Sequence, residues 1–132
     1  MNLEQRIQSL AQSGIISEAT QCDIQNVITT LQQWQVDIEQ DHVVMLVTHI
    51  AMALERSLQG NTLDTQFDTT LLAELQQEPH FMQVEKLSKT LLNKCKTQLS
   101  QAERGYLWAG VGALCEAQPQ LVDNAKSHLA YR

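Results

Sequence analysis

Residues 41–58 read DHVVMLVTHIAMALERSL and include the longest apolar-rich stretch of the chain, Val43–Leu54. Apolar side chains occupy nearly every side of this segment until Glu55, a pattern typical of a helix at the centre of a protein. Asp41 is a suitable N-cap, and Gly60-Asn61 a suitable helix end. We therefore expect a central helix here, with the other elements packed around it.

The neighbouring segments repeat their apolar residues every three or four positions, which is the period of a helix. Before the central helix, the pattern predicts a short helix with Leu3, Ile7, Leu10 and Ala11 that ends at Gly14, then a longer one capped by Ser17 with Ile24, Val27, Ile28, Leu31 and Trp34. After it come a short helix with Leu71, Leu72 and Leu75, a longer one from Phe81 to Cys95, one capped by Ser100 that Pro119 ends, and a last one with Leu121, Val122, Ala125 and Leu129.

Composition supports an all-α fold and excludes several classes of protein. The 132 residues (14.9 kDa) make about one domain, and 5 Gly with 2 Pro are too few for the turns of a β-sandwich or barrel. The formal charge of −6 argues against direct binding of nucleic acid or of a membrane surface.

The cysteines and the N-terminus point to a reducing compartment. Cys22, Cys95 and Cys115 are odd in number and lack the CxxC spacing, so neither a disulfide framework nor a zinc site is expected. Residues 1–14 lack a basic start followed by an apolar run, so we expect no signal peptide, and residues 43–54 are too short to span a bilayer. We expect a cytoplasmic protein.

Two histidines and an arginine stand on one side of the central helix. His42, His49 and Arg56 are each seven residues apart, so successive members differ by about 20° around the axis and by roughly 10 Å along it. Three interpretations remain for His49: a partly buried histidine held by a hydrogen bond, an imidazole that accepts a phosphoryl group near Arg56, or a zinc ligand completed from other helices.

The other polar residues give weaker signals. His80 and His128 are expected on the surface, and the pairs Glu55-Arg56 and Glu103-Arg104 on helix surfaces. The three cysteines are expected to be buried, and Trp34 and Trp108 to be core or interface anchors. Gly105, Gly110 and Gly112 share one predicted helix, which suggests close approach of another helix or a position where a larger side chain is not wanted. No motif for hydrolysis, metal or phosphate binding occurs, so we expect neither an enzyme nor a cofactor.

Two strings resemble the signatures of the PTS-regulation domain (PRD) family. LVTHIAMALERSLQGN, residues 46–61, is similar to the first signature, in which a histidine is followed seven positions later by an arginine and then by Gly-Asn. LSQAERGYLWAGVGAL, residues 99–114, is similar to the second signature through Glu103, Gly105, Tyr106 and Leu107. The family's second histidine falls at Gly110, so that site is missing.

This resemblance implies a compact five-helix bundle over residues 15–118, with helical extensions at 1–14 and 119–132. It also implies a regulatory module of the sugar phosphotransferase system that acts through protein–protein contacts in transcriptional regulation. His49 would be phosphorylated by the phosphocarrier HPr or an EIIB component, with Arg56 compensating the charge. Without an effector module we expect a stand-alone domain and a homodimer. The alternative is a helical interaction or structural protein that keeps the fold but not the phosphorylation.

Overall fold

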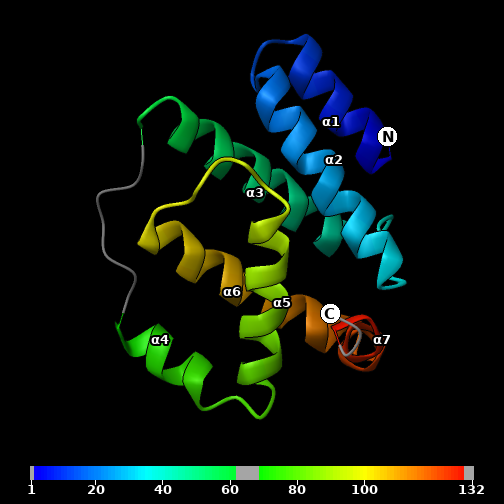
Figure 1. The fold of residues 1–132 in the computed structure, drawn as a ribbon, viewed down its shortest axis with the longest axis vertical. Coiled ribbons are helices and arrows are strands. Elements are labelled where there is room, and N and C mark those ends of the chain that lie inside the picture. Colours follow the sequence, from blue (N-terminus) through cyan, green and yellow to red (C-terminus); the bar gives the residue numbers. More distant parts are fainter. Residues whose placement is uncertain (1, 62–68, 130–132) are drawn as a thin grey trace.

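The computed structural model describes residues 2–61 and 69–129 and is all-helical over these ranges (Figure 1). The helices are α1 (Leu3–Gln12), α2 (Glu18–Gln33), α3 (Asp41–Leu58), α4 (Thr69–Gln76), α5 (Phe81–Asn93), α6 (Gln101–Ala117) and α7 (Gln120–Leu129). The predicted all-α class and the order of the helices are therefore confirmed. The side chains of Leu71, Leu72 and residues 125–129, which include predicted apolar positions and His128, lie outside the described part.

Helix ends follow the local sequence in most places. Ser17 and Ser100 cap α2 and α6 by accepting hydrogen bonds from the backbone N–H groups of Thr20 and Glu103. Gly14 has φ +76°, the left-handed conformation expected after the first helix. The predicted cap at Asp41 is wrong, because Gln40 is the N-cap of α3 and Asp41 is already helical.

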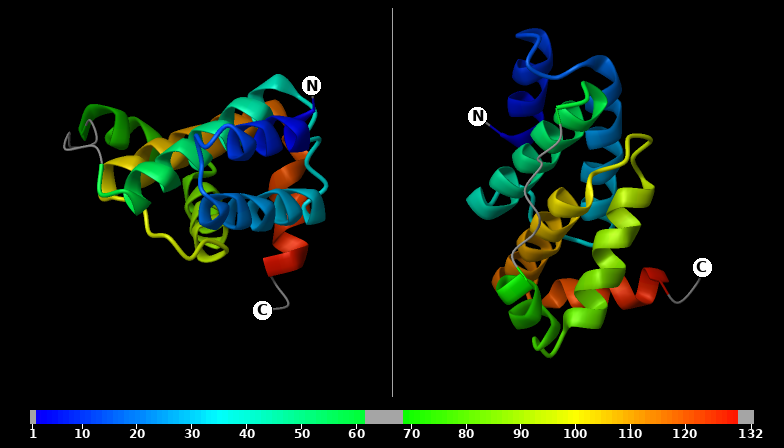
Figure 2. Two further views of the ribbon diagram at one scale, coloured as in Figure 1. Left: turned by 90° about the horizontal axis from the view of Figure 1, so that it is seen from above. Right: turned by 90° about the vertical axis from the view of Figure 1, so that its left-hand side faces the viewer.

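Two helices organise the packing. α3 lies between α2 and α6, while α6 also contacts α4, α5 and α7 (Figures 1 and 2). α1 packs on α2 at the outside of the bundle. Val43, Val47 and Leu54 of α3 have no exposed surface, so this helix does contribute to the centre of the core.

The composition of α3 suggested a helix buried on all sides, but one side of α3 is exposed. Met45 is 59% exposed and His49 is also exposed, whereas Leu46 and Ile50 next to them are buried. This side of α3 therefore borders an open groove and is only partly covered by α6. No helix in the described ranges is long and apolar enough to cross a membrane.

Candidate functional site: the groove between α3 and α6

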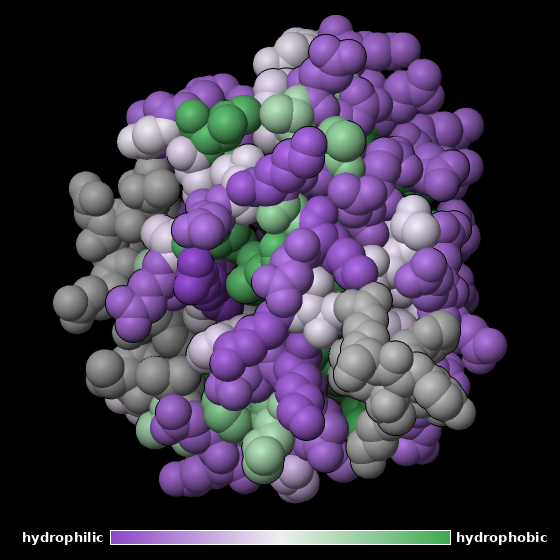
Figure 3. Space-filling view, viewed as in Figure 1, coloured by the Kyte–Doolittle hydropathy of each residue, from purple (hydrophilic) through white to green (hydrophobic). Residues whose placement is uncertain are grey.

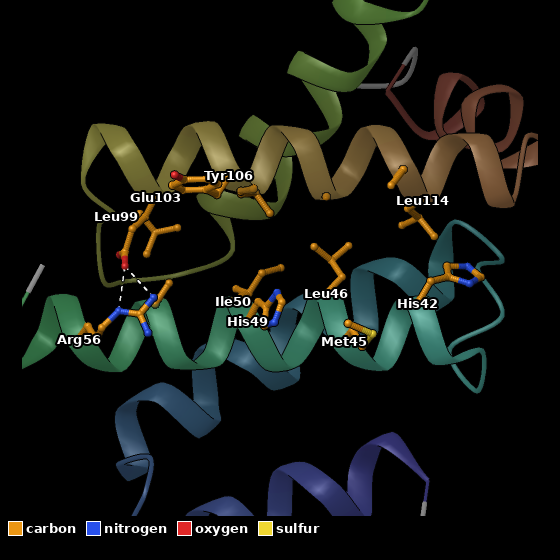
Figure 4. Close-up of a pocket in the computed structure, with 14 residues that line it drawn as sticks. His42, Met45, Leu46, His49, Ile50, Arg56, Leu99, Glu103, Tyr106 and Leu114 are labelled. Atoms are coloured by element: carbon orange, nitrogen blue, oxygen red, sulfur yellow. Dashed lines mark hydrogen bonds and ion pairs between the residues drawn. The ribbon is translucent and has the colours of Figure 1, made fainter. Parts of the chain in front are cut away.

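A groove of about 480 Å³ runs between α3 and α6, which are antiparallel along it (Figure 4). His42, His49 and Arg56 of α3 all line this groove, so they lie on one side of the helix, as their spacing of seven predicted. Glu103 and Tyr106 of α6 face them from the opposite wall. The groove thus joins parts of both PRD-like strings, although 37 residues, 62–98, separate the two strings in sequence.

His49 stands exposed in the middle of the groove. Its ring makes no hydrogen bond to any residue in the described part of the chain. The interpretation of His49 as a partly buried, hydrogen-bonded histidine is therefore wrong. Within the same part of the chain, no three His, Cys, Asp or Glu side chains come together as metal ligands. The imidazole is accessible to a reacting partner.

Arg56 and Glu103 form an ion pair across the groove (Figure 4). Arg56 donates to Glu103 Oε1 through Nε at 3.0 Å and through Nη2 at 2.8 Å. The Glu103 side chain is 2% exposed and that of Arg56 39% exposed. The prediction of surface charges is therefore wrong for Glu103, which needs its partner because an unpaired buried carboxylate is costly.

Ser100 and Glu103, three residues apart, match the sequence of a capping box, in which each side chain bonds the other residue's backbone N–H, but only one of the two bonds forms. Ser100 Oγ accepts a hydrogen bond from the Glu103 N–H, but the Glu103 carboxylate turns toward Arg56 instead of returning to the Ser100 N–H. Ser57 Oγ adds a long hydrogen bond of 3.4 Å to Glu103 Oε2. Glu103 thus caps α6 through its backbone and ties α6 to α3 through its side chain.

Glu55, the neighbour of Arg56, is also buried and not on the surface as predicted. Its Oε1 accepts hydrogen bonds from Ser17 N (2.7 Å), Ser17 Oγ (2.9 Å) and Thr20 Oγ1 (2.7 Å), and its Oε2 accepts one from Gln59 Nε2 (2.6 Å). Burial by itself would raise the pKa of Glu55, but these donors outweigh it and lower the pKa to about 2. Glu55 therefore anchors the start of α2 on α3.

His42 lies at the other end of the groove and contacts the buried Gln118. Gln118 Oε1 accepts from Asp37 N at 2.9 Å, and Gln118 Nε2 donates to Asp37 O at 3.1 Å. These two bonds fix which end of the amide is the donor. The 3.1 Å contact between Gln118 Nε2 and His42 Nε2 therefore requires the His42 nitrogen to act as the acceptor.

At Gly110, α6 packs closely against Leu46 of α3. A Cβ atom at this position would lie 2.6 Å from Leu46 Cδ1, so Leu46 occupies the space that a side chain would need. The predicted close approach is confirmed for Gly110, whereas a Cβ at Gly112 would meet nothing within 4 Å. The position of the family's second histidine is thus closed to any larger residue unless Leu46 moves.

The remaining predicted positions lie away from the groove or contribute only packing. His80 is exposed at the N-cap of α5 and Trp34 is buried, both as expected. Trp108 is half-buried, edge-on to Phe81 at 6.3 Å between ring centroids. The expectation for cysteines holds for buried Cys115 and is wrong for Cys22, which is exposed on the outer side of α2; Cys95 is half-buried.

The sequence did not lead us to predict that the side chains of Glu55, Glu103 and Gln118 are buried and paired with other elements. A signal was present for Glu55, because it follows Leu54 and lies four residues after Ala51, both of which are buried. A carboxylate at a core-facing position of a helix requires partners. Gln118 gave no comparable signal, since its partners come from a loop 81 residues away in sequence.

This arrangement defines a class of protein. It is an all-helical module with an accessible histidine in a groove that joins its two signature segments. The PRD domain family model matches residues 25–109, which contain most of both groove walls. The chain belongs to the PRD domain family. It is 30% identical over 113 residues to the protein called "Uncharacterized protein YhfY" of Escherichia coli strain K12, covering 85% of this chain and 93% of that protein. No solved structure matches.

Proposed function

We propose that this protein is a regulatory module of the sugar phosphotransferase system that accepts a phosphoryl group on His49 and acts through protein–protein contacts in transcriptional regulation. The exposure of the His49 ring in the α3–α6 groove carries this proposal. A neutral imidazole is nucleophilic near pH 7, and it must be reachable by the phosphorylated donor protein. In the transfer, a ring nitrogen of His49 attacks phosphorus as the phosphorus–nitrogen bond of the phosphocarrier HPr, or the corresponding bond of an EIIB component, breaks.

Arg56 supports the proposed phosphorylated state. It lies two turns from His49 on the same side of α3, with its guanidinium partly exposed and paired with Glu103. A phosphoryl group brings about −1.5 to −2 charges into the groove, and arginine is suited to binding it with two donors. The phosphoryl group would then compete with Glu103 for Arg56 and loosen the contact between α3 and α6.

The groove also offers a surface for the proposed protein contacts. Met45 and Tyr106 on its rims are 59% and 51% exposed. We infer that the five-helix unit of the family corresponds to α2–α6, with α1 and α7 as extensions. A change at the α3–α6 contact would then alter the packing within this unit. The interface of a homodimer is the simplest protein contact that such a change would affect.

The experiment is phosphorylation of the full chain with phosphoenolpyruvate, enzyme I and HPr, with and without candidate EIIB proteins. We expect the wild-type protein to become labelled and His49→Ala to lose the label. His80→Ala is the matched control, because His80 is also exposed but lies outside the groove. Equal labelling of His49→Ala and wild type would show that the acceptor is another residue.

A second function is favoured by Gly110 and Leu46. Since Leu46 fills the place of the family's second histidine, the chain is also compatible with a helical interaction protein that keeps the fold but not the phosphorylation. This alternative predicts that wild type takes up no label from HPr or from any EIIB tested.

A further inference from the structure

A second pocket, of about 320 Å³, lies outside the α3–α6 groove, where α5 ends and α6 begins. Lys89, Lys96 and Arg104 line it together with the polar side chains of Asn93, Thr97 and Gln98. Hydrophilic side chains also cover most of the face over α5 (Figure 3). The volume is at the lower end of pockets that take small molecules.

The charge of this region is opposite to that of the rest of the protein. Five of the nine basic residues fall within residues 86–104, where Glu103 is the single carboxylate. The segment thus carries a formal charge of +4, which leaves −10 for the remainder of a chain with a total of −6. Such a local concentration of one sign attracts a ligand of the opposite sign.

No residue lining the pocket is acidic, so its positive charge is not neutralised from within. Cys95 also lines the pocket, and burial together with the nearby Asp23 raises its pKa to about 12, which keeps the thiol uncharged. In the part of the chain that the structure describes, neither Lys96 nor Arg104 forms an ion pair, and Lys89 forms only an exposed one of 3.5 Å with Glu85.

The loop that carries these groups is held in place. The buried Asp23 of α2 accepts hydrogen bonds from the backbone N–H groups of Lys96 (3.0 Å) and Thr97 (3.2 Å). Arg104 Nε donates to Leu99 O at 3.0 Å, which positions the guanidinium and leaves its two terminal nitrogens for a ligand. A site ordered before binding loses less entropy when its ligand arrives.

The geometry points to a binding site for a small phosphate-bearing anion, inorganic phosphate or a phosphate monoester, formed by Lys89, Lys96 and Arg104. Two ammonium groups and a fork-shaped guanidinium suit a phosphate dianion, which offers three acceptor oxygens. The amide and hydroxyl groups of Asn93, Gln98 and Thr97 could hold the polar remainder of an ester. A nucleic acid fits less well, because no aromatic side chain lines the pocket and the rest of the chain repels a polyanion.

The test is an NMR titration of the full chain, once with inorganic phosphate and once with glycerol 3-phosphate, at constant ionic strength set with sodium chloride. We expect saturable shifts of the Lys96 and Thr97 amides and of the Arg104 Nε–H signal. Tighter binding of glycerol 3-phosphate than of phosphate assigns the site to an ester, and equal or weaker binding assigns it to the free ion.

Variants separate a built site from diffuse attraction. Arg104→Gln and Lys96→Gln should each weaken binding at least about tenfold, the effect of losing one charge-assisted hydrogen bond. Lys86→Gln is the control, since it removes the same charge from an exposed position of α5 that does not line the pocket. Lys96→Gln keeps the test informative if loss of the Arg104–Leu99 bond disturbs folding.

Three results would overturn the site: shifts that stay linear with concentration, equal weakening by Lys86→Gln, or tighter binding of a single-stranded oligonucleotide than of either phosphate compound. The titration does not depend on His49, so its outcome is separate from that of the labelling experiment.

Discussion

Glu55 is a charged residue held inside the protein by four hydrogen bonds. Its side chain is ionised although the residue is 6% exposed, because the donors of Ser17, Thr20 and Gln59 replace the water it has lost. The contact joins α3 to the start of α2, so ionisation of one carboxyl group contributes to the placement of a whole helix.

Stability should therefore fall in acid as Glu55 becomes protonated. The pKa of Glu55 is about 2 in the folded protein against an ordinary value of 4.5, so its contribution is present above about pH 4.5 and is lost as the pH falls toward 2. We expect the contribution at neutral pH to be on the order of 1–3 kcal/mol. Urea unfolding at a series of pH values from 2 to 7 measures it.

Glu55→Gln should reduce the slope of stability against pH in this window. Glu39→Gln is the control, because Glu39 is exposed in the loop between α2 and α3. If Glu55→Gln leaves the slope as steep as in Glu39→Gln, Glu55 is not the group responsible.

At the scale of elements, α6 carries two nearby glycines with different surroundings. Gly110 faces Leu46 of α3, while Gly112 has open space where a side chain would be. Both lie inside the helix, where alanine is favoured over glycine by about 1 kcal/mol. The two positions therefore separate helix propensity from packing between helices.

Gly112→Ala should stabilise the protein by up to about 1 kcal/mol. Gly110→Ala should be less stable than Gly112→Ala by about 1 kcal/mol, since Leu46 must leave its rotamer or shift into the groove. Denaturant unfolding of both variants measures the difference. In a Leu46→Ala background the difference should disappear, and equal stabilisation by both substitutions in the natural background would contradict close packing at Gly110.

At the scale of the whole molecule, four buried polar side chains connect elements distant in sequence. Glu55 joins α3 to α2, Glu103 joins α6 to α3, Asp23 joins α2 to the loop before α6, and Gln118 joins the end of α6 to the loop before α3. Such bonds fix the positions of helices relative to one another, because a buried polar group without a partner is costly.

Gln118→Ala should destabilise the whole protein by about 1–3 kcal/mol, as it leaves the backbone of Asp37 and the ring of His42 without their partner. The shift in the denaturant concentration at the unfolding midpoint measures this loss of stability, provided that the slope of the unfolding free energy against denaturant concentration is unchanged. Gln120→Ala, an exposed glutamine two residues later, is the control. A loss no larger than that of Gln120→Ala would mean that the Gln118 bonds contribute nothing net.

The helices and their order were predictable because they depend on local sequence. Apolar spacing located α2 and α5, and Ser17, Ser100 and Gly14 marked helix ends, since a cap is a contact within a few residues. The placement of His42, His49 and Arg56 on one side of α3 was predictable for the same reason: helical geometry depends only on their spacing of seven.

The sequence by itself thus determined an all-α PRD-family chain with His49 and Arg56 on one side of its third helix. Tertiary structure alone decided that His49 is exposed, that Glu55 and Glu103 are buried and paired, and that Leu46 closes the space at Gly110. The reason is that burial and pairing depend on which atoms a neighbouring helix brings near, and those atoms come from residues tens of positions away in the chain.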